Sequence, residues 1–154
     1  MNPPPAIIFL DTNVYLIGAA IDDSPEAQIL DWAGFGGDQN EVEQRVAVIL
    51  SDALTEQITR VARRLRHKDW AGEILSEIWH GMNVRFVVLD PDDVRKVEIQ
   101  GEIPRGDVTM YLSAKVGHAD CFISANHKLI RALVARSGDF LCYTPTEFIE
   151  QFLT

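Results

Sequence analysis

The chain has 154 residues, of which 47% are hydrophobic and 24% are charged, a composition typical of one globular domain with a sizeable core. Its formal net charge of −9 argues against a protein that coats nucleic acid with a basic surface, but it is compatible with an acidic site that holds metal ions. No uncharged apolar run approaches the roughly 18 residues of a membrane span, so no membrane partner is expected.

We expect a single domain over residues 1–154 that stays in the cytoplasm. The first ten residues, "MNPPPAIIFL", have neither the basic start nor the small-residue cleavage site of a signal peptide. Cys121 and Cys142 lie in apolar runs, which is typical of buried thiols in a reducing compartment.

Apolar runs alternate with segments of helical periodicity along the chain. In chain order we predict strand 6–10, helix 13–20, helix 22–37, strand 45–51, helix 52–65, helix 70–81, strand 84–90, helix 107–117, strand 120–124, helix 126–138, strand 140–144 and helix 145–153. Ser24 and Pro25 give the second helix a start signal, and Gly36 with Gly37 gives it an end.

Five apolar strands separated by helices predict an α/β fold, namely a three-layer α/β/α domain with a mostly parallel five-stranded sheet. In such sheets the ligand site lies beyond the carboxyl ends of the strands. Polar residues expected at this edge are Asp11, Thr12, Asn13, Ser51, Asp52, Glu56, Gln57, Asp90, Asp107, Ser124, Asn126 and Thr144.

Asp11 directly follows the most apolar strand, where an ionised carboxylate is costly to desolvate. One interpretation is that Asp11 caps the next helix. The other is that several carboxylates at this edge converge on a cation, since hard oxygen ligands suit Mg²⁺ or Mn²⁺.

Three segments in order carry a resemblance to a known family: "DTNV" after the first strand, "VILSDALTEQITRVARRL", and "PRGDVTMYLSAKVGHADCFISANHKLI". Together they resemble the PIN-domain family over almost the whole chain. The resemblance implies a PIN-like fold and an Mg²⁺- or Mn²⁺-dependent endoribonuclease that cuts single-stranded RNA to leave a 3′-hydroxyl and a 5′-phosphate. Many members of that family are toxins, so the resemblance also implies a possible antitoxin partner.

By resemblance, Asp11 matches the first acid of the family and Asn13 its companion in the motif. Asp107 matches the acid at the start of the helix before the fourth strand, and Ser124 stands where the family usually has threonine. Asp11 and Asp107 are therefore the candidate catalytic residues.

The sequence departs from the family at two acidic positions. Gln57 stands before Ile58 where the second acid is expected, and Glu56 lies one residue earlier, rotated by about 100° around the helix. Glu56 falls opposite the apolar stripe of its helix, so it is expected to face solvent. Asn126 stands where the family commonly has another acid.

The candidate metal ligands are therefore Asp11, Asp107, Glu56 and Asn126, with Asn13, Gln57, Asp120 and Ser124 as secondary candidates. Asp120 starts the fourth strand, about 13 Å from Ser124 at roughly 3.3 Å per residue, so it can compensate only in part.

"RVARRLRHK" is the one basic cluster that stands out in this acidic chain. Its residues Arg60, Arg63, Arg64 and Lys68 are candidates for binding the RNA backbone. The alternative is a solvated face paired with neighbouring acids. Trp70 and Trp79 could line a homodimer or partner surface, although core packing is expected for at least one of them.

Three functions follow in order of preference. The first is the metal-dependent endoribonuclease, and the second is a catalytically weakened PIN-like module that binds RNA or a partner protein. The third is a phosphotransferase of the haloacid-dehalogenase kind with Asp11 as nucleophile, which would need an aspartate where the chain has Asn13.

Overall fold

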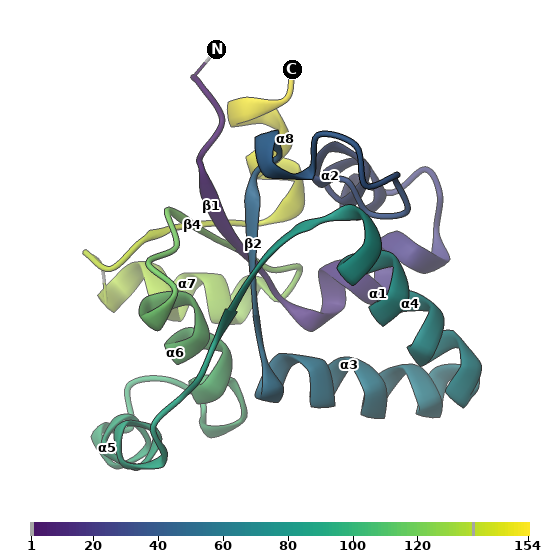
Figure 1. The fold of residues 1–154 in the computed structure, drawn as a ribbon. Helices are drawn as coiled ribbons and strands as arrows, with labels where there is room; N and C mark the ends of the chain where they lie inside the picture. The colour runs from purple at the N-terminus through teal and green to yellow at the C-terminus, as the bar shows by residue number, and fades with distance from the viewer. Residues whose placement is uncertain (1, 137) are drawn as a thin grey trace.

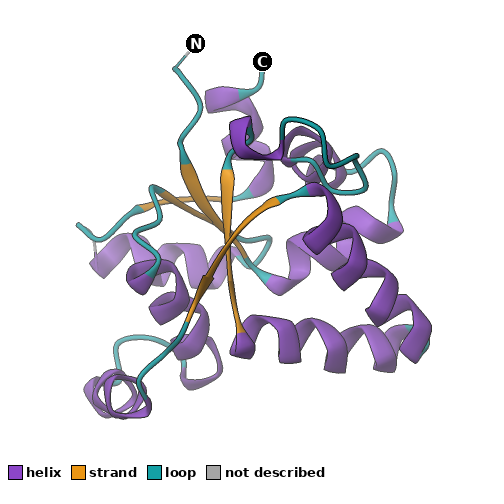
Figure 2. Ribbon diagram, in the orientation of Figure 1, coloured by secondary structure: helices purple, strands orange, loops and turns teal. Residues whose placement is uncertain are grey.

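A computed structural model describes residues 2–136 and 138–154. Its five strands form one sheet in the order β3-β2-β1-β4-β5, and every strand pair is parallel (Figures 1 and 2). The strands are β1 (Ile7–Leu10), β2 (Ala47–Ser51), β3 (Asn83–Val87), β4 (Cys121–Ile123) and β5 (Leu141–Tyr143). The predicted parallel α/β sheet is confirmed.

Eight α-helices connect and flank the strands within the described residues. They are α1 (Thr12–Ala20), α2 (Pro25–Ala33), α3 (Asp52–Leu65), α4 (Lys68–Gly81), α5 (Pro91–Gln100), α6 (Val108–Val116), α7 (His127–Arg136) and α8 (Pro145–Phe152). Two short 3₁₀ turns, η1 (Val42–Gln44) and η2 (Arg105–Asp107), complete the structure.

The middle of the sheet is buried on both faces. Ile8, Phe9 and Leu10 of β1 are fully buried, and the ring of Phe9 stacks on that of Phe122 in β4 with centroids 4.9 Å apart. Continuous apolar composition is what a central parallel strand requires, since helices cover both of its faces.

Helices pack on both sides of the sheet. α1, α2 and α4 lie to the right of the strands in Figure 1, and α6 and α7 lie to the left. α3 follows β2 at the lower edge of the view and packs against both α1 and α4. Both ends of the chain lie at the upper edge, where the side chain of Asn2 donates a hydrogen bond to that of Gln151.

The structure differs from the prediction between β3 and α6. α5 was not predicted, and strand β3 ends at Val87 instead of residue 90. Val87 pairs with Ser51, the last residue of β2, so the chain beyond Val87 has no strand to pair with. Asp90 instead caps α5, its carboxylate accepting a hydrogen bond from the backbone N–H of Asp92.

Two further differences concern helix ends and faces. The helix predicted over 22–37 ends at Ala33, because Gly34 adopts a left-handed conformation with φ of 101°. The helical spacing predicts an apolar stripe of Leu54, Ile58, Val61 and Leu65 on α3. The structure instead buries Leu54, Ile58 and Ala62, and Leu65 is 63% exposed. The helix predicted over 126–138 includes residue 137, which lies outside the described residues.

Within the described residues, no helix is long and apolar enough to cross a membrane.

Candidate metal centre

Asp11 connects the end of β1 to the start of α1, and it is only 5% exposed. Its Oδ1 atom accepts a hydrogen bond of 2.8 Å from the backbone N–H of Thr12, at the N-terminus of α1. Its Oδ2 atom accepts a hydrogen bond of 2.8 Å from the hydroxyl of Ser124. Asp11 therefore caps the helix, and its carboxylate is also held in place by the end of the neighbouring strand.

Asn13 joins the ends of β1 and β4. Its side-chain N–H₂ group lies 3.1 Å from the hydroxyl oxygen of Ser124 and 3.4 Å from Oδ2 of Asp11, donating to both. Its Oδ1 atom accepts a hydrogen bond of 2.9 Å from the backbone N–H of Ala125. Since both ends of the amide are occupied, Asn13 serves to orient Asp11 and Ser124.

Asp107 lies at the start of α6, half-buried, and its side chain makes no capping hydrogen bond there. A hydrogen bond of 2.7 Å between the hydroxyls of Ser51 and Ser113 fixes α6 against the end of β2. This contact between α6 and β2 helps to place Asp107 at the carboxyl edge of the sheet.

The electrostatics of the two aspartates are coupled. Partial burial raises the pKa of Asp107, and the negative charge of Asp11 raises it further. Burial also raises the pKa of Asp11, although its hydrogen bonds from Ser124, Thr12 and Asn13 oppose this effect. The charge of Asp11 thus acts on Asp107, and no cationic side chain forms an ion pair with either carboxylate in the described ranges 2–136 and 138–154.

Gln57 and Glu56 lie on different sides of α3. Gln57 is half-buried, and its Oε1 atom accepts a hydrogen bond from the hydroxyl of Thr12, the residue next to Asp11. Glu56 is exposed, as the helical register predicts, and lines a different cavity between α3, α5 and α6. The structure therefore brings Gln57 beside the Asp11 region and turns Glu56 away from it.

Asn126 directly precedes α7 and is exposed. Its Oδ1 atom accepts a hydrogen bond of 3.1 Å from the backbone N–H of Leu129, and its own backbone N–H donates to the hydroxyl of Ser124 over 3.0 Å. The oxygen that could bind a cation thus already caps a helix, which leaves one lone pair for any further ligand.

Asp120 lies at the opposite edge of the sheet from Asp11. Its Oδ2 atom accepts hydrogen bonds from the backbone N–H groups of Ala6 and Ile7, at 3.1 and 3.0 Å, where β1 begins. It joins β4 to β1 and does not reach the carboxyl edge.

The basic cluster lies on the second half of α3 and the start of α4. Its residues Arg60, Arg63, Arg64, Arg66 and Lys68 are all exposed. Arg66 stacks over the ring of Trp70, with its guanidinium carbon 4.4 Å from the ring centroid. In the part of the chain that the structure describes, none of the five forms an ion pair with an acid. Trp70 is buried, as expected of at least one of the two tryptophans, whereas Trp79 is 52% exposed and stacks on Phe86.

The carboxylate oxygens at this edge suit a hard divalent cation. No group of three or more His, Cys, Asp or Glu side chains that could hold a metal exists among the described residues, so a closed site of the zinc type is not built here. Asp11 and Asp107 fit Mg²⁺ or Mn²⁺, since Mg²⁺ keeps several waters and binds proteins through one or two carboxylates.

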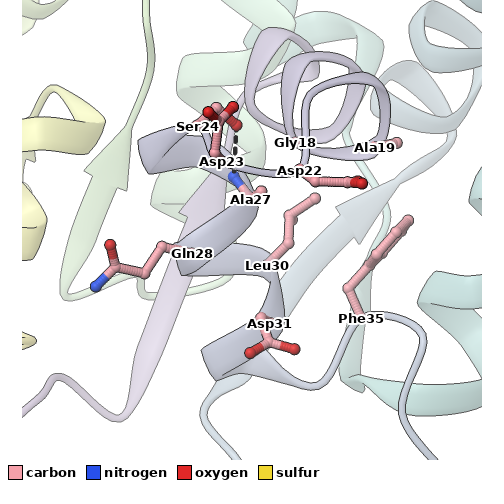
Figure 3. Close-up of a pocket in the computed structure, with 10 residues that line it drawn as sticks. All are labelled: Gly18, Ala19, Asp22, Asp23, Ser24, Ala27, Gln28, Leu30, Asp31 and Phe35. Atoms are coloured by element: carbon pink, nitrogen blue, oxygen red, sulfur yellow. Dashed lines mark hydrogen bonds between the residues drawn. The ribbon is translucent and has the colours of Figure 1, made fainter.

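A separate acidic cavity of about 510 Å³ lies between α1 and α2 (Figure 3). Asp22, Asp23 and Asp31 line it, and Ser24 beside them caps α2 by accepting a hydrogen bond from the N–H of Ala27. It lies beside the last turn of α1, where Gly18 and Ala19 line it. Gly18 is seven residues after Asp11, or about 10 Å along the helix at roughly 1.5 Å per residue. This cavity is not part of the candidate metal centre.

Sequence reasoning assigned no role to Thr12 or Ser113. Thr12 is buried and links the Asp11 region to Gln57, and Ser113 links α6 to β2. Thr12 was recognisable as a polar residue after a strand. No local pattern predicts the role of Ser113, because its partner Ser51 is 62 residues away in the sequence.

The comparisons with known proteins bear on the fold. No protein-family model matches the chain, and no curated protein matches its sequence. Among solved structures, the chain is similar to one in the VapBC2 complex from Rickettsia felis, determined bound to a DNA fragment from its promoter. The TM-score is 0.57 at 12% sequence identity, over 90% of this chain and 98% of that one. A likeness at such low identity shows that the fold is shared.

Proposed function

We propose that this protein is a PIN-like, Mg²⁺- or Mn²⁺-dependent endoribonuclease that cuts single-stranded RNA. The observation that carries the proposal is the pair of carboxylates at the carboxyl edge of the sheet, Asp11 and Asp107, each with a pKa raised by burial. Such a pair is costly in the free protein and is relieved by a cation.

In this proposal each residue has a definite task. Asp11 and Asp107 bind the ion, and Ser124 orients Asp11 through its hydrogen bond to Oδ2. Gln57 lies where a third oxygen ligand can be supplied, and Asn126 contributes at most one lone pair. When bound, the ion would lower the pKa of a water molecule and polarise the scissile phosphate.

The basic cluster supports RNA as the substrate. Arg64 follows Gln57 at a spacing of seven residues and lies along the same side of α3, and Arg60 lies between that side and the side of Glu56. Their charges are not neutralised by ion pairs within residues 2–136 and 138–154 and are available to RNA phosphates.

A toxin–antitoxin setting is part of the proposal. The similar fold in VapBC2, together with the PIN resemblance of the sequence, favours a protein that is neutralised by a cognate antitoxin. A small adjacent reading frame encoding a DNA-binding protein would support this setting.

A second candidate function is a PIN-like module that binds RNA or a partner protein without cutting. The specific observation in its favour is that amides, Gln57 and Asn126, stand at two positions where the resemblance expects acids. Fewer negative charges at the site mean weaker attraction for a divalent ion.

Cleavage of a labelled single-stranded RNA in the presence of Mn²⁺ tests the proposal. We expect fragments with 5′-phosphate ends from the wild type, no cleavage with chelator, and a loss of at least about 100-fold in Asp107→Asn. Cleavage that survives both the chelator and Asp107→Asn would contradict the metal mechanism. No cleavage by folded wild type or by Asn126→Asp, which adds a charge while keeping an N-cap residue, would favour the binding module.

A further inference from the structure

A second cavity, of about 440 Å³, opens at the carboxyl edge of the sheet, beyond the ends of β2 and β3. It lies between the first turn of α3, the end of β3, α5 and α6. Its apolar wall includes Val87, Val88, Leu89 and Val94, and Val88 is 78% exposed. The volume is within the range of about 300–1,000 Å³ that is typical of small-molecule pockets.

Two carboxylates, Asp52 and Glu56, line the same cavity. Neither makes an ion pair or a side-chain hydrogen bond to another residue of the described segments 2–136 and 138–154. The one cation in the lining, Arg95, is bound to Asp92 on its own helix. The side chains that line the cavity therefore offer more free hydrogen-bond acceptors than free donors.

The cavity and the candidate metal centre take residues from the same two helices, α3 and α6. Thr109 lines it and lies two residues after Asp107 at the start of α6. Glu56 lines it from α3 and precedes Gln57, which turns to the Asp11 side. The cavity and the candidate metal centre thus lie at the same carboxyl edge of the sheet, on different sides of the first turns of α3.

We propose that this cavity binds a guanine base of the RNA, so that the enzyme prefers guanine beside the bond it cuts; this inference rests on the proposed function. A flat base can lie against the apolar wall, and bases of single-stranded RNA are read by hydrogen bonds to their Watson–Crick edges. A carboxylate only accepts hydrogen bonds, and guanine presents two adjacent donors, N1–H and the N2 amino group. Adenine, cytosine and uracil have no such pair of donors on that edge.

The surface next to the cavity suits the rest of the strand. Arg60 and Arg63 follow Glu56 at spacings of four and seven residues, so they lie one and two turns along the same exposed face of α3. Glu56 repels phosphates but accepts hydrogen bonds from a base, whereas the arginines attract the phosphates of the following nucleotides. This order of charges fits an RNA strand that enters along α3.

The test is a titration of ¹⁵N-labelled protein with GMP, IMP and AMP in chelator, followed by the amide signals of Val87, Val88 and Val94. We expect GMP to saturate these signals, IMP to bind about fivefold or more weakly because it lacks the N2 amino group, and AMP to bind more weakly still. Glu56→Gln should remove the difference between GMP and IMP. Glu73→Gln, an exposed glutamate of α4 outside the cavity lining, should keep it.

Equal binding of the three nucleotides, or shifts confined to other parts of the protein, would overturn the proposal. So would saturation of the same signals by argininamide with none by GMP, since the cavity would then accept a basic side chain of a protein partner. The chelator separates this test from cleavage. RNA cleavage without guanine preference would remove this inference alone, and GMP binding without any RNA cleavage would remove the proposed function alone.

Discussion

The carboxyl group of Asp107 is the most informative single group at the site, because burial and the charge of Asp11 both raise its pKa. An acid whose pKa is higher in the folded than in the unfolded protein stabilises the fold at low pH. That stabilisation is complete below the unfolded pKa of about 4 and is lost as the pH rises through the folded pKa.

We therefore predict that Asp107→Asn makes the metal-free protein more stable than the wild type at pH 7 and no more stable at pH 3. Denaturant unfolding in chelator at a series of pH values measures this difference. Mn²⁺ should reverse the order at pH 7, because only the wild type keeps both carboxylates for the ion. If the variant and the wild type differ in stability by the same amount at pH 3 and pH 7, ionisation of Asp107 does not destabilise the fold.

The sequence led to Asp11 and Asp107 because an acid after a buried strand or at a helix start is visible in a local pattern. It also indicated that Gln57 and Glu56 face different ways, since the helical period alone decides this. The position of Asp120 was less predictable. Its hydrogen bonds to Ala6 and Ile7 span more than 110 residues, and only the pairing of β1 with β4 brings them together.

At the level of elements, α5 is a helix whose apolar pattern is too weak to predict it from the sequence. Of its residues only Val97 is buried, so no apolar stripe stands out. Its end signals were nevertheless present in the sequence, with Asp90 and Pro91 at the start and Gly101 at the end. Capping residues were a better guide here than periodicity.

Two glycines of α4 make a matched pair for testing helix packing. A Cβ added at Gly81 would collide with the carbonyl oxygen of Gly34 and lie 2.9 Å from the backbone nitrogen of Gly37, whereas one at Gly72 would meet nothing within 4 Å. Backbone atoms cannot rotate away as side chains can.

We predict that Gly81→Ala lowers the free energy of unfolding by about 1–3 kcal/mol, and that Gly72→Ala raises it by about 0.5–1 kcal/mol because alanine favours the helix. Thermal unfolding of the two variants measures both effects. Equal stability of Gly81→Ala and the wild type would mean that the end of α4 does not pack closely against the segment after α2.

For the whole molecule, a net charge of −9 and an exposed basic face on α3 make RNA binding a local electrostatic event. We predict that single-stranded RNA binds more weakly as salt increases, and that Arg60→Glu combined with Arg64→Glu flattens this dependence. Each lost phosphate contact reduces the slope of log K against log salt by about 0.7 for a single strand. Fluorescence anisotropy with chelator present measures binding without cleavage.

Lys115→Glu is the control for that experiment. Lys115 is exposed near the end of α6, at the other end of the helix from Asp107. Lys115→Glu changes the net charge as much as Arg60→Glu alone, which is the variant it is compared with, but it lies off the proposed path. The same loss of RNA affinity in Lys115→Glu would mean that binding follows overall charge and not the α3 face.

The central claim is that Asp11 and Asp107 together hold a divalent ion, and titration with Mn²⁺ followed by electron paramagnetic resonance tests it most directly. The account predicts one Mn²⁺ per chain, affinity at least about tenfold lower in Asp107→Asn, and affinity about tenfold higher in Gln57→Glu, which adds a carboxylate beside the site. Glu73→Gln, which removes a charge far from the site, should bind like the wild type. Equal Mn²⁺ affinity in the wild type and Asp107→Asn would contradict the account.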